Sequence, residues 1–217
     1  MQFHPHEFFD LSSYVHKVLF ERITLVWEAL NILKEYLDDL VYPTSTPMVP
    51  EGVYLENPER IVIGRGTRIE PGAYIRGPCW IGEGSIIRHG AYIREYVITG
   101  KECVIGHATE IKHSILLNNA HAAHFNYVGD SILGNHVNLG AGAKCANLRF
   151  DGRSIAVHHE KKKWETGLTK LGAILGDRSQ LGCNVVTNPG TLFLPDAVCA
   201  PCENIGGMVS ASKTLKR

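Results

Sequence analysis

A six-residue period dominates this sequence from residue 63 onward and strongly limits its possible folds. Stepping forward by six from Ile63 meets Ile or Leu at almost every position as far as Leu117. The full series is Ile63, Ile69, Ile75, Ile81, Ile87, Ile93, Thr99, Ile105, Ile111, Leu117 and Ala123. A helix has a period of about 3.6 residues and a strand a period of two. A fixed period of six is instead typical of a solenoid.

Each hexad is interpreted as one flat side and one corner of a triangular coil, with its aliphatic residue inside. Three hexads close one turn, and successive turns stack as parallel strands about 4.8 Å apart. The period slips after Ala123 and is absent between Ala146 and Ala173, which predicts a long loop projecting from one corner. Loops this long in a compact domain are usually functional. The period resumes at Leu133, Leu139 and Cys145, and again at Leu175, Leu181, Thr187, Phe193 and Cys199.

The chain before the repeat has a helical pattern instead. Apolar residues recur at steps of three and four through residues 7–41, and Pro43 and Pro47 follow. We expect this segment to cap the first coil, whose open edge would otherwise pair with another chain. The predicted organisation is an N-terminal helical segment (1–45), a linker (46–60), a β-helix (61–205) with an inserted loop (146–173), and a C-terminal tail (206–217).

Composition excludes several classes of partner. Basic and acidic residues balance at 22 each, so the chain has no strong overall field for nucleic acid or a membrane. Residues 1–30 show no basic stretch followed by an apolar run, and no apolar run reaches the length of a membrane span. We therefore expect a cytoplasmic protein whose six cysteines are free thiols.

Residues 18 apart share a corner of such a coil, and one corner is basic. Arg76, Arg94 and Lys112 follow at intervals of 18. Three cations this close repel one another unless an anion lies among them, so this basic ladder predicts a phosphate site. The alternative is a solvated basic edge that neighbouring carboxylates neutralise: Glu70, Glu95 and Glu110.

Histidines form a second group. His124 precedes a tyrosine and an acid, and an unperturbed histidine, which titrates near pH 6.5, can accept a proton from an amine. In a chain with eleven histidines, His124 could equally be a surface group. His89 and His107 are 18 apart, and together with His113 and His124 they also suggest a metal site.

Three motifs carry a resemblance to a known family: Glu110-Ile-Lys112, His124-Phe-Asn-Tyr-Val-Gly-Asp130 and Asn138-Leu-Gly-Ala-Gly142. They resemble the acetyltransferase half of the bifunctional UDP-N-acetylglucosamine pyrophosphorylase/glucosamine-1-phosphate N-acetyltransferases. Residues 146–151 and 170–177 are more similar to the archaeal sugar-1-phosphate nucleotidylyltransferase/acetyltransferases. The resemblance covers roughly residues 60–200. It implies an all-β, left-handed parallel β-helix, although right-handed crossovers are the general rule.

The resemblance also implies a reaction and roles. An acetyl group would pass from acetyl-CoA to the amine of glucosamine-1-phosphate or galactosamine-1-phosphate, with no metal, in a homotrimer whose sites lie between subunits. His124 would be the general base. Arg94 and Lys112 would hold the sugar phosphate, and the basic ladder adds Arg76. The remaining roles are positioning of the amino sugar by Tyr127, Asn138 and Asn147, and an acetyl-CoA channel along the backbone near Ala141 and Cys183.

The chain departs from the family in two respects. We expect no nucleotidylyltransferase half, because only the short helical segment precedes the repeat. The family's loop lysines are not clearly kept, and Arg153 or Lys161–Lys163 could replace them, although a solvated charged loop is the simpler interpretation. The family's C-terminal cations, which meet the CoA phosphates, have candidate counterparts in Lys213, Lys216 and Arg217.

Two other functions remain open. The γ-carbonic anhydrases, zinc hydratases with the same fold, place three histidines between trimer subunits. The histidines here do not have that spacing. A non-catalytic scaffold that binds a sugar nucleotide is the other alternative.

Overall fold

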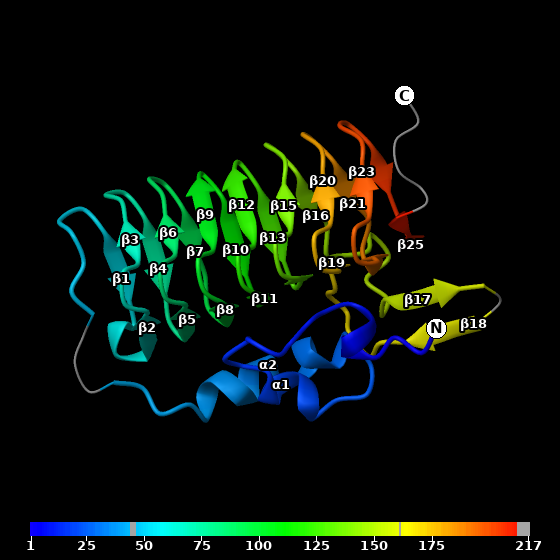
Figure 1. Cartoon of the computed structure of the whole chain (residues 1–217), viewed down its shortest axis with the longest axis horizontal. Helices are drawn as coiled ribbons and strands as arrows, with labels where there is room; N and C mark the ends of the chain where they lie inside the picture. The colour runs from blue at the N-terminus through cyan, green and yellow to red at the C-terminus, as the bar shows by residue number, and fades with distance from the viewer. Residues whose placement is uncertain (44–46, 161, 212–217) are drawn as a thin grey trace.

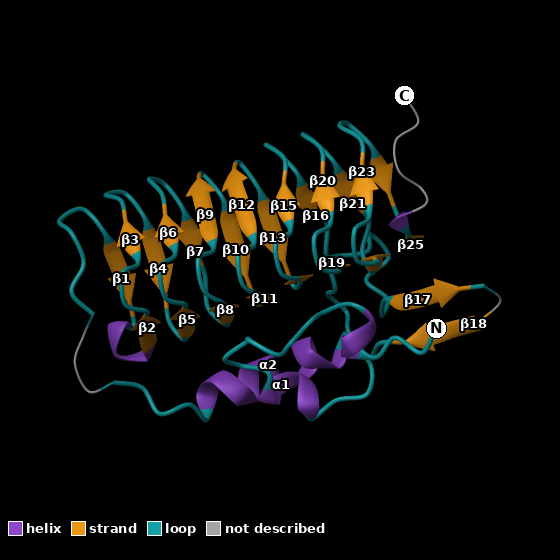
Figure 2. Cartoon of the chain, in the orientation of Figure 1, coloured by secondary structure: helices purple, strands orange, loops and turns teal. Residues whose placement is uncertain are grey.

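Three parallel sheets form the walls of a triangular β-helix that runs the length of the molecule (Figure 1). The computed structural model describes residues 1–43, 47–160 and 162–211. The chain passes repeatedly from sheet A to sheet B to sheet C, and every neighbouring pair in these sheets is parallel (Figure 2). The predicted hexapeptide β-helix is therefore confirmed, in its left-handed form.

The strands are short, as one side of a small prism requires. Sheet A contains β1 (Tyr54–Glu56), β4 (Tyr74–Arg76), β7 (Tyr92–Ile93), β10 (Glu110–Lys112), β13 (Tyr127–Gly129), β16 (Lys144–Cys145), β21 (Val186–Thr187) and β24 (Asn204–Ile205). Sheet B contains β2 (Ile61–Ile63), β5 (Cys79–Ile81), β8 (Val97–Thr99), β11 (Ser114–Leu116), β14 (Ile132–Leu133), β19 (Ala173–Leu175), β22 (Thr191–Phe193) and β25 (Met208–Val209). Sheet C contains β3 (Arg68–Ile69), β6 (Ile86–Ile87), β9 (Val104–His107), β12 (His121–His124), β15 (Asn138–Leu139), β20 (Gln180–Leu181) and β23 (Val198–Cys199).

The coil begins and ends outside the predicted 61–205. Strand β1 lies within the predicted linker, where Tyr54 pairs with Tyr74 of the next coil. Strand β25 lies within the predicted tail and pairs with β22. The six-residue rule does not detect these outer coils, because their side chains have a neighbouring coil on one side only.

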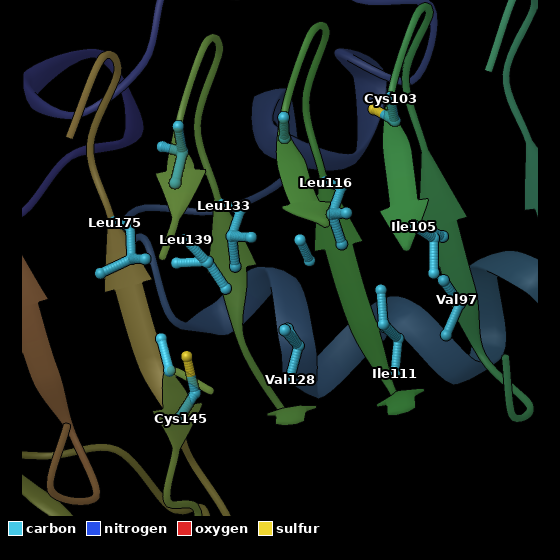
Figure 3. Packing of buried hydrophobic residues seen from close by; sticks show 14 of the residues in the cluster. Val97, Cys103, Ile105, Ile111, Leu116, Val128, Leu133, Leu139, Cys145 and Leu175 are labelled. Carbon is cyan, nitrogen blue, oxygen red and sulfur yellow. The ribbon is translucent and has the colours of Figure 1, made fainter. Parts of the chain in front are cut away.

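The interior is a column of aliphatic and thiol side chains (Figure 3). Its register corrects one prediction. Ile111 pairs with Ile93, 18 residues earlier, but Leu116 pairs with Thr99, 17 residues earlier. The corner at His113 is one residue shorter than the corner before it, so the period slips there and not after Ala123. Leu116 and Ala122 therefore face the interior in place of the predicted Leu117 and Ala123.

The N-terminal segment does not cap the first coil. It lies along the outside of sheet B (Figure 1). The outward side chains of that sheet are apolar, and the helices bury them: Trp80, Ile98, Ile115, Ile132, Ile174 and Leu192. Burying this long column removes much more apolar surface from water than covering one coil edge would.

Only part of the N-terminal segment is helical. It contains a 3₁₀ turn η1 (Pro5–Glu7), a short helix α1 (Val18–Glu21) and a longer helix α2 (Glu28–Asp38). Helix α2 begins where the Glu28 carboxylate accepts hydrogen bonds from the backbone N–H groups of Thr24 and Leu25. A second 3₁₀ turn, η2 (Pro58–Arg60), precedes β2. None of the helices in the described residues is long and apolar enough to cross a bilayer.

The inserted loop projects from the corner between sheets A and B and forms an antiparallel hairpin. Its strands are β17 (Ala156–His159) and β18 (Lys162–Glu165). The ring of Phe3 packs 4.8 Å from Trp164 and 5.5 Å from Trp27, measured between ring centroids. The N-terminal segment therefore holds the hairpin in place.

Candidate functional site

One group of predicted site residues stands in a column at the corner where sheet C meets sheet A. His124 pairs with His107 of the preceding coil. The backbone N–H of Gly142 donates to the carbonyl of His124 at 2.9 Å, and the N–H of Asn184 donates to the carbonyl of Ala141 at 2.8 Å. The structure thus places His124, Ala141 and Cys183 on successive coils of this C–A corner.

Two further histidines continue this column below His124. The Nδ1 atoms of His89 and His107 each lie 2.8 Å from a backbone carbonyl oxygen of the preceding coil, so each Nδ1 carries the proton. Their rings stack with centroids 5.4 Å apart. His113 lies on a different corner, and within the described residues no three His, Cys, Asp or Glu side chains gather as a metal site.

The basic ladder exists, but carboxylates neutralise it. Each cation has an acidic partner: Arg76 with Glu56 at 3.1 Å, Arg94 with Glu110 at 3.0 Å, and Lys112 with Asp130 at 2.8 Å. Glu95 lies 3.5 Å from Arg76 and 4.0 Å from Arg94. Of the three glutamates proposed as neutralising neighbours, Glu95 and Glu110 act as such, whereas Glu70 pairs with Arg68.

Asp130 is the centre of a buried polar network at the corner between sheets A and B. Only 5% of this residue is exposed. Its carboxylate accepts hydrogen bonds from Lys112 Nζ at 2.8 Å, from His113 Nδ1 at 3.0 Å and from the side-chain amide of Asn147. The same amide lies 3.3 Å from the Tyr127 hydroxyl. The network joins Lys112, Tyr127 and Asn147, three of the predicted substrate-binding residues.

Sequence reasoning assigned no role to Asp130 or His113. The signal for Asp130 was its place at the end of the His124–Asp130 motif, whereas nothing local marked His113 as its partner. Burial raises the pKa of Asp130, but the hydrogen bonds from His113, Lys112 and Asn147 outweigh burial and hold that pKa below its usual value.

This lowered pKa predicts a pH dependence. The ionised Asp130 stabilises the fold fully above the pKa of an unfolded aspartate, about 4, and that stabilisation is lost as the pH falls below it. Replacing Asp130 with asparagine should therefore make the free energy of unfolding vary less between about pH 5 and pH 2. Urea unfolding curves over this range measure the slope, and an unchanged slope would contradict the network's role.

A hollow of about 390 Å³ opens beside the network, with one wall from the coils and one from the inserted loop. The coil wall includes Lys112 and Asp130, and the loop wall is residues 167–170. The other candidate loop cations are engaged elsewhere: Arg153 pairs with Asp151 at 3.0 Å and Lys163 pairs with Glu165. Lys161, Lys213, Lys216 and Arg217 lie outside the described residues.

Not all predicted residues converge within one chain. Tyr127 lies on sheet A between the two corners, whereas Asn138 is exposed on sheet C, paired with His121 of the preceding coil. Asn138 therefore faces a different side of the prism from Tyr127 and Asn147.

Comparisons with known proteins bear on this arrangement. A family described as the GMPPB C-terminal domain matches residues 75–195. The bifunctional sugar-1-phosphate nucleotidylyltransferase/acetyltransferase of Sulfurisphaera tokodaii is 36% identical over 164 residues, which are 76% of this chain and 40% of that protein. The chain thus spans less than half of that relative.

Two further proteins extend the comparison. The uncharacterized acetyltransferase YaiX of Escherichia coli strain K12 is 34% identical over 78% of this chain and 74% of its own length. The UDP-N-acetylglucosamine acyltransferase from Campylobacter jejuni shares the fold, with a TM-score of 0.52 and 16% identity over 75% of this chain and 69% of that one.

Proposed function

Because the chain belongs to the hexapeptide-repeat acetyltransferases, we propose that it transfers an acetyl group from acetyl-CoA to the amine of an amino-sugar 1-phosphate. Glucosamine-1-phosphate and galactosamine-1-phosphate are the two candidate acceptors. The observation that carries the proposal is the pairing of an exposed histidine, His124, at one edge of sheet A with the Lys112–Asp130–Asn147 network at its other edge. The name of the Sulfurisphaera relative supports this class of substrate.

The proposed chemistry needs a base and an oxyanion site. The neutral amine attacks the thioester carbonyl carbon, and His124 accepts the proton that the new amide nitrogen loses. Backbone N–H groups of the C–A corner near Ala141 and Cys183 are placed to stabilise the oxyanion. The C–S bond then breaks, and the departing thiolate takes the proton to leave as CoA.

A coupled assay tests the proposal directly. Release of the CoA thiol is followed with glucosamine-1-phosphate, galactosamine-1-phosphate and unphosphorylated glucosamine as acceptors. Thiol release that requires an amino-sugar phosphate supports the proposal. CoA binding without turnover on any acceptor would favour the non-catalytic scaffold instead.

The arrangement of the faces favours a homotrimer. The N-terminal segment covers sheet B, so sheets A and C and the C–A corner remain to contact another copy. A neighbouring copy packed there would bring Asn138 of one chain toward Tyr127 of another, which a single chain keeps on separate faces. Light scattering should give three times 24.0 kDa, and a monomeric mass would contradict this proposal.

A further inference from the structure

The hollow beside Asp130 holds one cation that its surroundings do not neutralise. The ladder cations are paired with carboxylates, and Lys112, whose side chain is 13% exposed, directs its ammonium group to Asp130. Lys170 lines the same hollow from the inserted loop. Among the described residues, no carboxylate lies within ion-pair distance of its ammonium group. The local excess of positive charge therefore comes from Lys170 and not from the ladder.

We propose that Lys170 binds the phosphate of the acceptor in this hollow, an inference that rests on the proposed acetyl transfer for the identity of the acceptor. An anion that displaced a glutamate from Arg76 or Arg94 would break an existing ion pair. An anion at Lys170 breaks none, so its full charge-assisted contact contributes to binding. Lys112 borders the same hollow and adds a second cation close by, although Asp130 already shares its charge.

The backbone places Lys170 reproducibly against the network. Lys170 forms a bridge with Leu148, and the N–H of Leu171 donates to the carbonyl of Asn147 at 3.0 Å. The N–H of Gly172 donates to the carbonyl of Asp130 at 2.8 Å. The end of the inserted loop is therefore joined to both residues of the network, which lowers the entropic cost of holding the ammonium group at the hollow.

The other end of the loop is equally restrained. The N–H of Ile155 donates to the carbonyl of Leu168 at 2.8 Å, and the Thr166 hydroxyl donates to the carbonyl of Ile155 at 2.6 Å. Leu168 also packs against the apolar cluster that includes the N-terminal segment. The wall carrying Lys170 is thus part of the folded body, and a phosphate can bind there without ordering a free loop.

Isothermal titration calorimetry on the full chain tests this assignment. Glucosamine-1-phosphate is titrated against the wild-type protein and against Lys170→Ala, Lys170→Arg and Lys163→Ala. A lost charge-assisted contact should raise the Kd about 10- to 100-fold in Lys170→Ala. Lys170→Arg should recover most of the affinity. Lys163→Ala removes the same charge from β18, outside the hollow, and should leave the Kd unchanged.

Two measurements keep the outcome decisive. Thermal unfolding of each variant shows that the fold is retained, as the exposed Lys170 side chain leads us to expect. Titration with acetyl-CoA should give the same Kd for wild type and Lys170→Ala. A Kd for glucosamine-1-phosphate that does not change in Lys170→Ala, or one that changes equally in Lys163→Ala, would overturn the assignment.

The same data separate this inference from the proposed reaction. Phosphate-dependent binding that requires Lys170, without thiol release in the coupled assay, would refute acetyl transfer and leave the Lys170 site standing. Thiol release with an unchanged KM for glucosamine-1-phosphate in Lys170→Ala would refute the site and leave the reaction standing.

Discussion

Replacing His124 with alanine should lower kcat about 10²- to 10⁴-fold, the usual contribution of a positioned general base. An amino sugar is largely protonated near neutral pH and becomes a nucleophile only after it loses a proton. His124 is exposed at the C–A corner, on the same column as Ala141 and Cys183, where the proposed thioester would lie. The measurement is kcat in the coupled assay at saturating concentrations of both substrates.

His121 offers a matched control three residues earlier on β12. Its ring faces outward on sheet C, and burial, followed by the charges of Arg88 and His136, lowers its pKa. We expect His121→Ala to keep most of the activity. If His121→Ala abolished turnover while His124→Ala retained it, the base would be misassigned, and if both stayed active the proposed mechanism would have to be abandoned.

Replacing Trp27 with alanine should lower the free energy of unfolding by about 3–5 kcal/mol, as large-to-small changes of buried aromatic residues do. Trp27 is 1% exposed and packs against Phe3 in the cluster between the N-terminal segment and sheet B. Removing its ring leaves a cavity at the point where the segment, the hairpin and the coil meet. Urea unfolding followed by circular dichroism measures the loss.

Val15 provides the control within the same segment. It is 64% exposed, so Val15→Ala should change the free energy of unfolding by less than about 0.5 kcal/mol. If both variants unfolded at the wild-type urea concentration, the N-terminal segment would not be an integral part of the fold.

The unpaired face of sheet B was visible in the sequence only indirectly. The residues just before several inward positions are themselves large and apolar, as at Trp80, Ile98 and Ile132. Two adjacent apolar positions in a strand point to opposite faces, so both faces of that sheet must be buried. The partner that buries the outer face was not readable, because the helical pattern of the N-terminal segment fits any apolar surface.

The sequence by itself determined the coil. The period of six reflects the fact that each side of a narrow triangular prism admits one inward side chain, so Ile75, Ile93 and Ile111 reveal the fold before any contact is known. The same arithmetic aligned Arg76, Arg94 and Lys112, because strand register carries every side chain of a coil with it.

Only the tertiary structure decided where charge is left over. Whether a cation is neutralised depends on how far flexible side chains reach across a corner, and a period contains no information about that reach. The pairing of Lys112 and His113 with Asp130, and the return of Lys170 to the same hollow, depend on one shortened corner and on a loop outside the repeat. The position of that loop is set by Phe3, Trp27 and Trp164, which meet only in the folded chain.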